Sequence, residues 1–399
     1  MIHDIGALVG GAEHSLYNIR RELVRRGHEV RTATGDRPRP QPGFSDYTFS
    51  SRDATVPGKL VHYLYNHSAK TTISFAIRDF RPEVIHAGTV TKISPAGVKA
   101  MKGTPTIMDL RDYGLMYPAL HKYLPKDEFC RYGDDACCPL HAGYFRYYFE
   151  LLRIYLHRKR FDQIAAFVAG SEHMKRLAEQ LGMKPAVVLN SPIETIPEQL
   201  PGVPKLPDSI LYAGRLEPEK GVLELVNSFE LVRKSLPDAK LLIAGSGSLS
   251  DEIDSLIMDR RLCGSVTLLG HINRQELQQW YVKTRIVAIP SLWPEPFGRV
   301  GPEAMAFGVP VVASGRGGMT DWLNDGQNGI IADPSDVKSL AASLVRLLQD
   351  ETLYQLMSEN ARQSAHRFRV ENYVDELEAL YRGAAASSKR LRSRKIKAP

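Results

Sequence analysis

The stretch that decides the fold is Pro290-Ser-Leu-Trp-Pro-Glu-Pro-Phe-Gly-Arg-Val-Gly-Pro-Glu-Ala-Met-Ala-Phe-Gly-Val-Pro-Val-Val-Ala313. The apolar run 286–290 predicts a buried strand, which enters a turn rich in proline and glycine. A helix is predicted to begin near Arg299, and 309–313 predicts the next strand. In an open α/β sheet, such a strand-to-helix turn lies at the carboxyl ends of the strands, where ligands bind. The free N–H groups at the start of the helix suit a phosphate.

Two carboxylates lie eight positions apart in this stretch, Glu295 and Glu303. Carboxylates are poor partners for an anion, but they are good hydrogen-bond acceptors for hydroxyl groups such as those of a sugar. The stretch therefore predicts a site for a ligand that carries both phosphate and hydroxyl groups. The alternative is that both acids are solvated charges on the helix and on the turn before it.

In this context the chain resembles glycosyltransferase family 4, the retaining nucleotide-sugar transferases that have the two-domain GT-B fold. The family signature sets its two glutamates in a Pro-Ser-x-x-x-Glu-x-Phe-Gly context. The resemblance implies that Glu295 touches the donor sugar, that Glu303 binds the ribose hydroxyls, and that the start of the helix stabilises the leaving diphosphate. The residues of this chain that match or adjoin the signature are Pro290, Ser291, Glu295, Phe297, Gly298, Arg299, Val300 and Glu303.

A second motif, Tyr212-Ala-Gly-Arg-Leu-Glu-Pro-Glu-Lys-Gly221, follows another predicted strand. Its Arg215 and Lys220 project from a loop that leads into a helix. Arginine offers a planar fork to phosphate oxygens and lysine a compact charge, so the pair suits a diphosphate. Taken without their context, two basic residues on a loop are ordinary surface charges.

Glycines mark two further loops. Gly10 and Gly11 precede Glu13 and a predicted helix that ends at Gly27. Paired glycines let the backbone approach a ligand closely, and the resemblance places this loop against the donor diphosphate or the acceptor. The resemblance also places Gly245 near the nucleotide and His271 at the edge of its pocket.

The acceptor side is predicted from residues that follow strands in the first half of the chain. Arg111 stands where many relatives have a histidine, and Asp112 follows it. Arg111 would hold a negative acceptor group and Asp112 would accept the proton of the acceptor hydroxyl. A structural salt bridge of Arg111 with a nearby acid is an equal alternative. Two interpretations of His86, at another strand end, are equally favoured. Its side chain faces the acceptor, or it is a buried histidine whose ring nitrogens find hydrogen-bond partners within the fold.

Composition bounds the class of protein. With 399 residues, 43% hydrophobic and 24% charged, the chain predicts a soluble globular protein of two domains. It has no apolar run of 18 residues and does not open on a secretory signal, so a cytoplasmic location is expected. The net charge of the chain is +7, and the segment 387–397 holds six positive charges and no acid. The rest of the chain is therefore nearly neutral. A nucleic-acid partner is therefore not expected. For the tail, the alternatives are solvated disorder and weak contact with an anionic membrane.

Strand and helix patterns alternate in both halves, which predicts an α/β protein of the GT-B type with two Rossmann-like, doubly wound parallel-sheet domains facing across a cleft. The expected parts are an acceptor domain (1–193), a proline-rich linker (194–207), a nucleotide-sugar domain (208–365), a helix within 366–383 that by resemblance returns to the first domain, and a basic disordered tail (384–399). The strand before Gly6 is unusually short, with four residues at most. Predicted strands are 29–34, 84–86, 106–109, 164–169, 187–190, 209–214, 240–245, 266–270, 286–290, 309–313 and 329–332.

Two other features carry alternatives. Cys130, Cys137 and Cys138, with His141 after them, have some of the spacing of a zinc site, but adjacent cysteines rarely serve one tetrahedral metal and no metal is predicted. Aromatic and basic residues mix over 142–166. This segment is interpreted as a helix covering the first domain, with an interfacial helix near a lipid-linked acceptor as the alternative.

The predicted function is transfer of a sugar from a nucleoside diphosphate sugar to the hydroxyl of a sugar, lipid-linked or small-molecule acceptor, with retention. Family habit suggests polysaccharide or glycolipid assembly as the setting. The chain contains no Asp-x-Asp, and Arg215 with Lys220 can replace a metal, so no metal or other cofactor is expected. Two alternatives share the scaffold: a nucleotide-sugar 2-epimerase, and a sugar-nucleotide-binding protein without catalysis.

Overall fold

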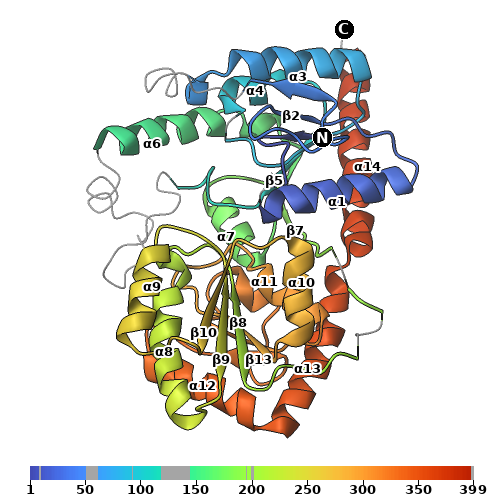
Figure 1. Ribbon diagram of the computed structural model, residues 1–399. Helices are drawn as coiled ribbons and strands as arrows, with labels where there is room; N and C mark the ends of the chain where they lie inside the picture. Colours follow the sequence, from blue (N-terminus) through green and yellow to red (C-terminus); the bar gives the residue numbers. More distant parts are fainter. Residues whose placement is uncertain are drawn as a thin grey trace. The chain divides into compact units, whose positions relative to one another are not determined.

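The computed structural model describes residues 1–8, 10–50, 62–91, 93–117, 144–194, 196–198 and 202–396, and gives the backbone alone at 144–146 and 388–396. These residues form two compact units. Unit 1 is Met1–Pro192 together with the chain from Val370, and unit 2 is Ile193–Arg369. Each unit contains one parallel sheet between helices (Figure 1), so the predicted class of two Rossmann-like domains is confirmed.

Unit 1 has a seven-stranded sheet in the order β3-β2-β1-β4-β5-β6-β7. Its strands are β1 Ile2–His3, β2 Ala33–Gly35, β3 Tyr47–Phe49, β4 Ile85–Ala87, β5 Thr106–Leu110, β6 Ala166–Ala169 and β7 Ala186–Val188. Its α-helices are α1 Gly11–Arg25, α3 His67–Phe80, α4 Ser94–Ala100, α6 Tyr144–Arg158, α7 Glu172–Gln180 and α14 Val370–Ile396.

Strand β2 is shorter than the sequence predicts. The segment 29–34 was expected to be extended throughout, but strand geometry begins at Ala33. The reason lies in its neighbour, because the ladder with β1 begins where Ile2 pairs with Ala33 and continues only to His3 and Thr34. A strand is defined by its partner as much as by its own residues.

Unit 2 has a six-stranded parallel sheet in the order β10-β9-β8-β11-β12-β13. Its strands are β8 Ser209–Ala213, β9 Lys240–Ala244, β10 Val266–Gly270, β11 Ile286–Ile289, β12 Val311–Ala313 and β13 Gly329–Ile331. Its α-helices are α8 Val222–Ser235, α9 Ser250–Asp259, α10 Arg274–Lys283, α11 Val300–Ala306, α12 Val337–Gln349 and α13 Glu351–Ala365.

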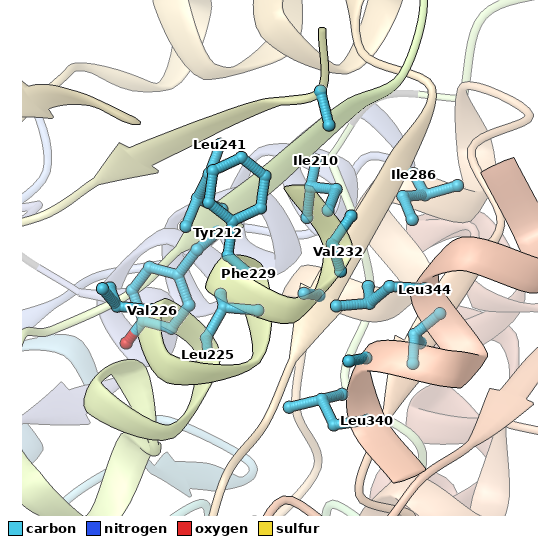
Figure 2. Packing of buried hydrophobic residues seen from close by; sticks show 14 of the residues in the cluster. Ile210, Tyr212, Leu225, Val226, Phe229, Val232, Leu241, Ile286, Leu340 and Leu344 are labelled. Carbon is cyan, nitrogen blue, oxygen red and sulfur yellow. The ribbon is translucent and has the colours of Figure 1, made fainter. Parts of the chain in front are cut away.

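Both faces of the unit 2 sheet are covered, because alternate residues of a strand point to opposite faces. On β8, Ile210 and Tyr212 join the apolar cluster under α8, α9 and α12, whereas Leu211 joins the one under α10 and α11. Figure 2 shows the first of these clusters, in which side chains of α8 and α12 meet those of the sheet: Ile210, Tyr212, Leu225, Val226, Phe229, Val232, Leu241, Ile286, Leu340 and Leu344. Burial on two faces explains why these strands are continuous apolar runs in the sequence.

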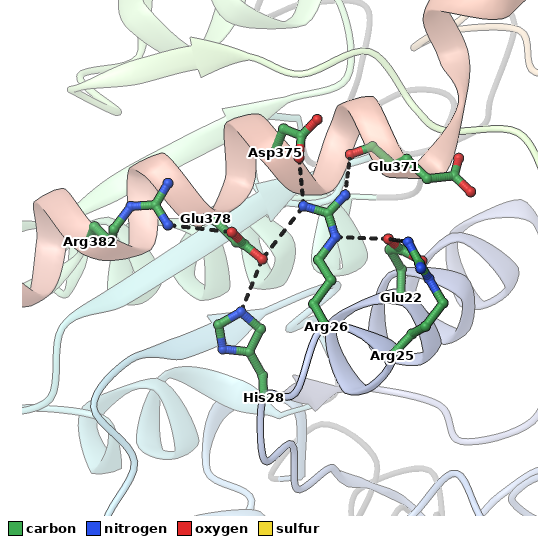
Figure 3. A network of polar contacts seen from close by, with 8 residues as sticks. All are labelled: Glu22, Arg25, Arg26, His28, Glu371, Asp375, Glu378 and Arg382. Carbon is green, nitrogen blue, oxygen red and sulfur yellow. Dashed lines mark hydrogen bonds and ion pairs between the residues drawn. The ribbon is translucent and has the colours of Figure 1, made fainter.

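Helix α14 returns to unit 1 and lies along α1 (Figure 3). The guanidinium of Arg26, at the end of α1, donates to Asp375 (2.6 Å), to Glu22 (2.8 Å) and to the carbonyl oxygen of Glu371 (2.9 Å). His28 lies 3.0 Å from Glu378 in the same network. Because one arginine bridges both helices, the ion pairs fix the register of α14 on α1.

The basic end of the chain differs from the expectation of disorder, since α14 continues to Ile396. The segment 384–396 opens with three alanines and then holds mostly lysine, arginine, leucine and serine, with no proline or glycine. Alanine, leucine, lysine and arginine all have high helix propensity, so a helix that has already begun can propagate through them.

Candidate functional site

The predicted donor residues of unit 2 lie at its topological switch point. Strand β8 pairs with β9 on one side and with β11 on the other, and the chain order of the strands reverses between β8 and β11. Arg215 and Lys220 follow β8, and Glu295 follows β11. Loops at the carboxyl ends of two such strands form the ligand-binding crevice of open α/β sheets.

Lys220 and Glu295 form an ion pair between these two loops. The Lys220 ammonium lies 2.6 Å from Oε1 of Glu295, and the same oxygen accepts hydrogen bonds from the Ser291 hydroxyl (2.6 Å) and from the Trp293 indole N–H (3.0 Å). The ammonium also lies 4.8 Å from the centroid of a Trp293 ring, within cation–π range. Three donors and an aromatic face therefore converge on one carboxylate.

This arrangement keeps Glu295 ionised. Burial alone would raise the pKa of its carboxyl group, but the charge of Lys220 and the three hydrogen bonds outweigh burial and lower the pKa below its ordinary value. Glu295 is thus a fixed anion, and its ion-pair partner among the described residues, Lys220, is a cation that can also face a phosphate.

Glycine brings the two loops together. Gly221 has a left-handed backbone (φ 67°), and a Cβ atom at this position would lie 1.9 Å from the carbonyl oxygen of Pro290. Next to it, the amide of Leu292 donates to the carbonyl oxygen of Glu219 at 3.0 Å. Only glycine permits this approach, and it sets Lys220 opposite Glu295.

Arg215 does not join this ion pair. Its guanidinium donates to the buried carboxylate of Glu219 at 2.7 Å, and half of its side chain remains exposed. The Tyr212 hydroxyl bonds the Arg215 carbonyl oxygen at 2.7 Å, which holds the backbone in place. Arg215 is therefore anchored at one edge and keeps a solvent-facing side for a ligand.

Glu303 lies between two arginines. Its Oε1 accepts from Arg274 at 2.8 Å and from Arg299 at 2.9 Å, and Arg274 also bonds Glu194 at 2.7 Å. Beneath it the phenol of Tyr281 is buried, which raises the pKa of that hydroxyl. Arg274 is a functional candidate that the sequence did not indicate, although its place as the first residue of α10, directly after the Asn273 cap, was a usable signal.

The remaining residues of the signature have mainly structural surroundings. Phe297 is buried, packs against Phe368 at 5.6 Å and accepts the Trp322 indole N–H on its carbonyl oxygen, so its side chain belongs to the core. Gly298 takes the left-handed conformation (φ 76°) that the turn requires. Val300 begins α11, which has only seven residues and is capped by Arg299 without a side-chain hydrogen bond.

Gly245 and His271, which are predicted to lie near the nucleotide, follow neighbouring strands. Gly245 follows β9 and its amide donates to the carbonyl oxygen of Gly270, the last residue of β10, at 2.8 Å. His271 comes next in the chain and is exposed. Both lie at the same edge of the sheet as Lys220 and Glu295.

Unit 1 has its own switch point, between β1 and β4. Gly10 caps α1 and Gly11 is its first residue. Glu13, in the first turn, lies 3.3 Å from Nε2 of His3, and the Thr89 amide donates to Nδ1 of the same ring at 3.0 Å. Because Nδ1 accepts, the ring proton sits on Nε2 and points at Glu13; burial opposes ionisation of Glu13, but this hydrogen bond and others lower its pKa overall.

On the acceptor side, Arg111 and His86 prove to be structural partners of a buried acid. Arg111 donates to Asp109 (2.8 Å), to the Tyr373 hydroxyl (2.9 Å) and to Ser191 (3.2 Å). His86 lies 3.1 Å from Asp109 and 2.8 Å from the Tyr381 hydroxyl. Burial alone would raise the pKa of Asp109, but Arg111 and His86 lower it strongly.

These contacts bear on the two alternatives that the sequence leaves open for Arg111 and for His86. To bind a ligand, Arg111 or His86 would have to break its contacts with the buried Asp109. The structure therefore favours a salt bridge for Arg111 and a buried, hydrogen-bonded histidine for His86. Asp112 remains a candidate for the acceptor side, because its side chain is partly exposed and, among the described residues, accepts a hydrogen bond from the Gly114 amide at 2.7 Å.

Within the described residues, no group of three or more His, Cys, Asp or Glu is arranged to hold a metal ion. Cys130, Cys137, Cys138 and His141 lie outside the described residues. None of the described helices has the length and apolar character needed to cross a membrane.

Two family models match adjoining parts of the chain. Glycosyltransferase Family 4 matches residues 9–197, and Glycosyl transferases group 1 matches residues 196–364. The two models meet at residues 196–197, a few residues after the division between the two units at Pro192 and Ile193. The chain belongs to glycosyltransferase family 4.

Several curated proteins resemble this family 4 chain over part of its length. It is 35% identical to a glycogen synthase of Mycobacterium tuberculosis over 157 residues, which is 39% of this chain and 38% of that protein. It is 33% identical to the D-inositol 3-phosphate glycosyltransferase of Corynebacterium kroppenstedtii over 46% of this chain and 42% of that protein. The chain thus matches about two fifths of the length of these curated relatives.

Solved structures resemble the whole of the family 4 chain. Sucrose-phosphate synthase from Thermosynechococcus elongatus superposes with a TM-score of 0.74 at 19% identity, covering 97% of this chain and 99% of that one. HepE from Anabaena, solved with UDP and glucose, superposes with a TM-score of 0.68 at 19% identity, covering 95% and 97%. At this identity the likeness establishes the fold.

Proposed function

We propose that this family 4 protein transfers a sugar from a nucleoside diphosphate sugar to an acceptor hydroxyl, with retention at the anomeric carbon and without a metal ion. The observation that carries the proposal is the ion pair of Lys220 and Glu295 at the switch point of unit 2. It sets a cation suited to phosphate 2.6 Å from a carboxylate suited to hydroxyls. HepE, a structural neighbour, is solved with UDP and glucose, which supports a donor of this class.

Each residue at the edge of the sheet receives a role. An ammonium has three hydrogens, so Lys220 can hold Glu295 with one and a phosphate oxygen with another. Arg215, anchored by Glu219, presents its exposed side to the diphosphate. As the anomeric bond breaks, negative charge grows on the leaving group, and a preorganised cation contributes several kcal/mol to the barrier.

The two glutamates bind hydroxyl groups. Glu295 is fixed as an anion and accepts hydroxyls of the donor sugar. Glu303 accepts the ribose hydroxyls, and we assign them to Oε2 because Arg274 and Arg299 both bond Oε1. Retention follows if the leaving phosphate oxygen assists attack on the same face, since Glu295 is held by Lys220, Ser291 and Trp293 in a binding role.

The acceptor belongs to unit 1 in this proposal. Asp112 accepts the proton of the attacking hydroxyl, and Glu13, oriented by His3, orients the acceptor. The acceptor is a sugar, a lipid-linked sugar or a small molecule in polysaccharide or glycolipid assembly. The protein is cytoplasmic, and the basic end of α14 makes weak contact with an anionic membrane face.

Nucleotide binding provides the first test. Thermal unfolding is measured with UDP, GDP, ADP and dTDP in EDTA, for the wild type, for Arg215→Ala and for Arg260→Ala. Arg260 is the matched control because it pairs with Glu230 at 2.8 Å and is similarly exposed, but it caps the C-terminal end of α9 and does not follow a strand at the switch point. At about 100 times its dissociation constant, a bound nucleotide adds about 2.7 kcal/mol.

We expect a shift with one nucleotide in the wild type and in Arg260→Ala, and its loss in Arg215→Ala. With that nucleotide's sugar, release of the diphosphate should require an acceptor. Conversion of the donor without acceptor would identify a 2-epimerase instead, and binding with no turnover would identify a non-catalytic protein. No shift with any nucleotide overturns the proposal.

A further inference from the structure

Helix α6 presents an apolar stripe to the exterior. The exposed fractions of its side chains are 61% at Tyr148, 37% at Leu151, 45% at Leu152 and 53% at Tyr155. Leu151 and Leu152 are adjacent, and each lies three or four residues from Tyr148 and from Tyr155, so the four side chains form one continuous stripe along the helix. Four large apolar or aromatic side chains therefore stand together on one exposed face.

The opposite face of α6 is also apolar and is buried against unit 1. Tyr147 and Ile154 are nearly inaccessible, and α6 packs on α4 (Figure 1). A helix that covers a domain normally turns polar residues outward. Here the outward line has no charged residue until Lys159, which lies one turn beyond Tyr155. The outward composition is therefore unexplained by the fold of unit 1.

Charge is added at the C-terminal end of the stripe. Arg158, Lys159 and Arg160 are consecutive, and the Lys159 ammonium lies 4.5 Å from the Tyr155 ring centroid. The single acid of α6, Glu150, is neutralised by Arg153 at 2.7 Å. The surface thus combines two leucines, two flanking tyrosines and a basic end, without an unpaired acid on the helix.

We propose that this stripe docks unit 1 on an anionic lipid surface. Leucine enters the boundary between head groups and acyl chains, tyrosine rings settle at the head-group level, and basic residues pair with lipid phosphates. The exposed Lys159 beside the Tyr155 ring, with Arg158 and Arg160 on either side of it in the chain, matches the phosphates of lipid head groups, and this combination with the apolar stripe favours the bilayer. The inference does not depend on the proposed transfer reaction, because binding is measured without a nucleotide.

Flotation with lipid vesicles tests the docking. The full chain is mixed with phosphatidylcholine vesicles that contain or lack phosphatidylglycerol. Binding is expected to the anionic vesicles, and Leu151→Glu with Leu152→Glu should weaken it roughly tenfold or more, since two partly buried leucines are replaced by charges that lipid phosphates repel. Lys159→Ser should weaken it by about fivefold.

The matched control is Met258→Glu with Leu356→Glu, because these side chains are 58% and 55% exposed in unit 2 and do not belong to the stripe. It should float like the wild type. In a second measurement, Tyr155→Trp should be quenched by brominated lipid, whereas Tyr65→Trp, at a tyrosine that is 49% exposed elsewhere in unit 1, should not. Circular dichroism verifies that each variant is folded.

Three outcomes overturn the docking. The first is flotation of the double leucine variant to the same extent as the wild type. The second is loss of flotation on deletion of 384–399 while the leucine variant retains it, which assigns the contact to the end of α14. The third is a dimer in light scattering that the leucine variant dissociates, which assigns the stripe to a second copy of the chain.

Discussion

Replacing Lys220 with methionine removes the cation that holds Glu295 ionised, and the structure gives the size of the effect. The two charged atoms are 2.6 Å apart, and the side chains are only 16% and 10% exposed. At an effective dielectric constant of about 20, this separation corresponds to about 6 kcal/mol of attraction. Desolvation of both groups cancels much of that, and removal of one partner of a buried pair typically costs about 3–5 kcal/mol.

We expect the lower end of that range, about 3 kcal/mol, because Ser291 and Trp293 still donate to Glu295 in the variant. Adding Glu295→Gln to Lys220→Met should recover about 2 kcal/mol, since the amide oxygen accepts the same hydrogen bonds without a buried charge. The matched control is Arg260→Met. Its ion pair with Glu230 is far more exposed, so the loss should stay within about 1 kcal/mol.

The loss of stability in Lys220→Met should depend on pH in a way that identifies Glu295 as its cause. In the wild type, the folded-state pKa of Glu295 lies below its ordinary value. Its stabilisation is therefore present above the ordinary pKa and is lost as the pH falls through the folded-state pKa. In Lys220→Met, burial is no longer offset by a cation and the folded-state pKa rises above the ordinary value. The free-energy cost of burying the ionised Glu295 without its cation is then fully present at neutral pH, and it shrinks as the pH falls toward the ordinary pKa.

Urea titrations of the full chain, followed by circular dichroism at several pH values, measure these differences on the transition that contains unit 2. A loss below about 1 kcal/mol that does not vary with pH would refute the reasoning. It would mean that Glu295 is hydrated in solution and that Lys220 does not hold it.

Three further predictions concern stability. The His157 side chain is buried and has no hydrogen-bond partner among the described residues, and burial beside Arg153 lowers its pKa to about 3. As the pH falls, the unfolded chain therefore binds a proton at His157 before the folded chain does. In urea titrations, the free energy of unfolding of the wild type should fall by about 2 kcal/mol between pH 7.5 and pH 5, and that of His157→Gln should fall by less. Gly221→Ala should cost about 3 kcal/mol or more, whereas Gly264→Ala, also left-handed but with open space, should cost about 1 kcal/mol. Tyr373→Phe removes a hydrogen bond from a buried guanidinium and should lower the free energy of unfolding by about 1.5–3 kcal/mol.

The strands of unit 2 could be predicted because each is a short apolar run between glycine or proline turns. All six lie within the predicted ranges to within a residue or two at their ends. The meeting of Lys220 with Glu295 could be anticipated for the same reason, since the loops after two strands of one sheet share an edge. What could not be anticipated was which partners each side chain finds there.

The two arginines around Glu303 illustrate that limit. Arg299 lies four residues before Glu303 on the same helical turn, so its contact is local. Arg274 reaches Glu303 from α10, 29 positions earlier in the chain. No periodicity encodes that approach, because it depends on how α10 and α11 pack on one face of the sheet.

Arg111, which stands where many relatives have a histidine, has partners in the fold that explain why an arginine fits this position. Its partners Asp109 and Ser191 are joined by Tyr373, 262 positions away on α14. A histidine at this position has two ring nitrogens and could not serve all three, whereas a guanidinium has five donors. His86 meets the same Asp109 from β4, so the imidazole contact is made from a neighbouring strand. The consequence is a rigid base for Asp112, whose carboxylate remains partly exposed beside an anchored Arg111 and is the acid that the transfer proposal needs.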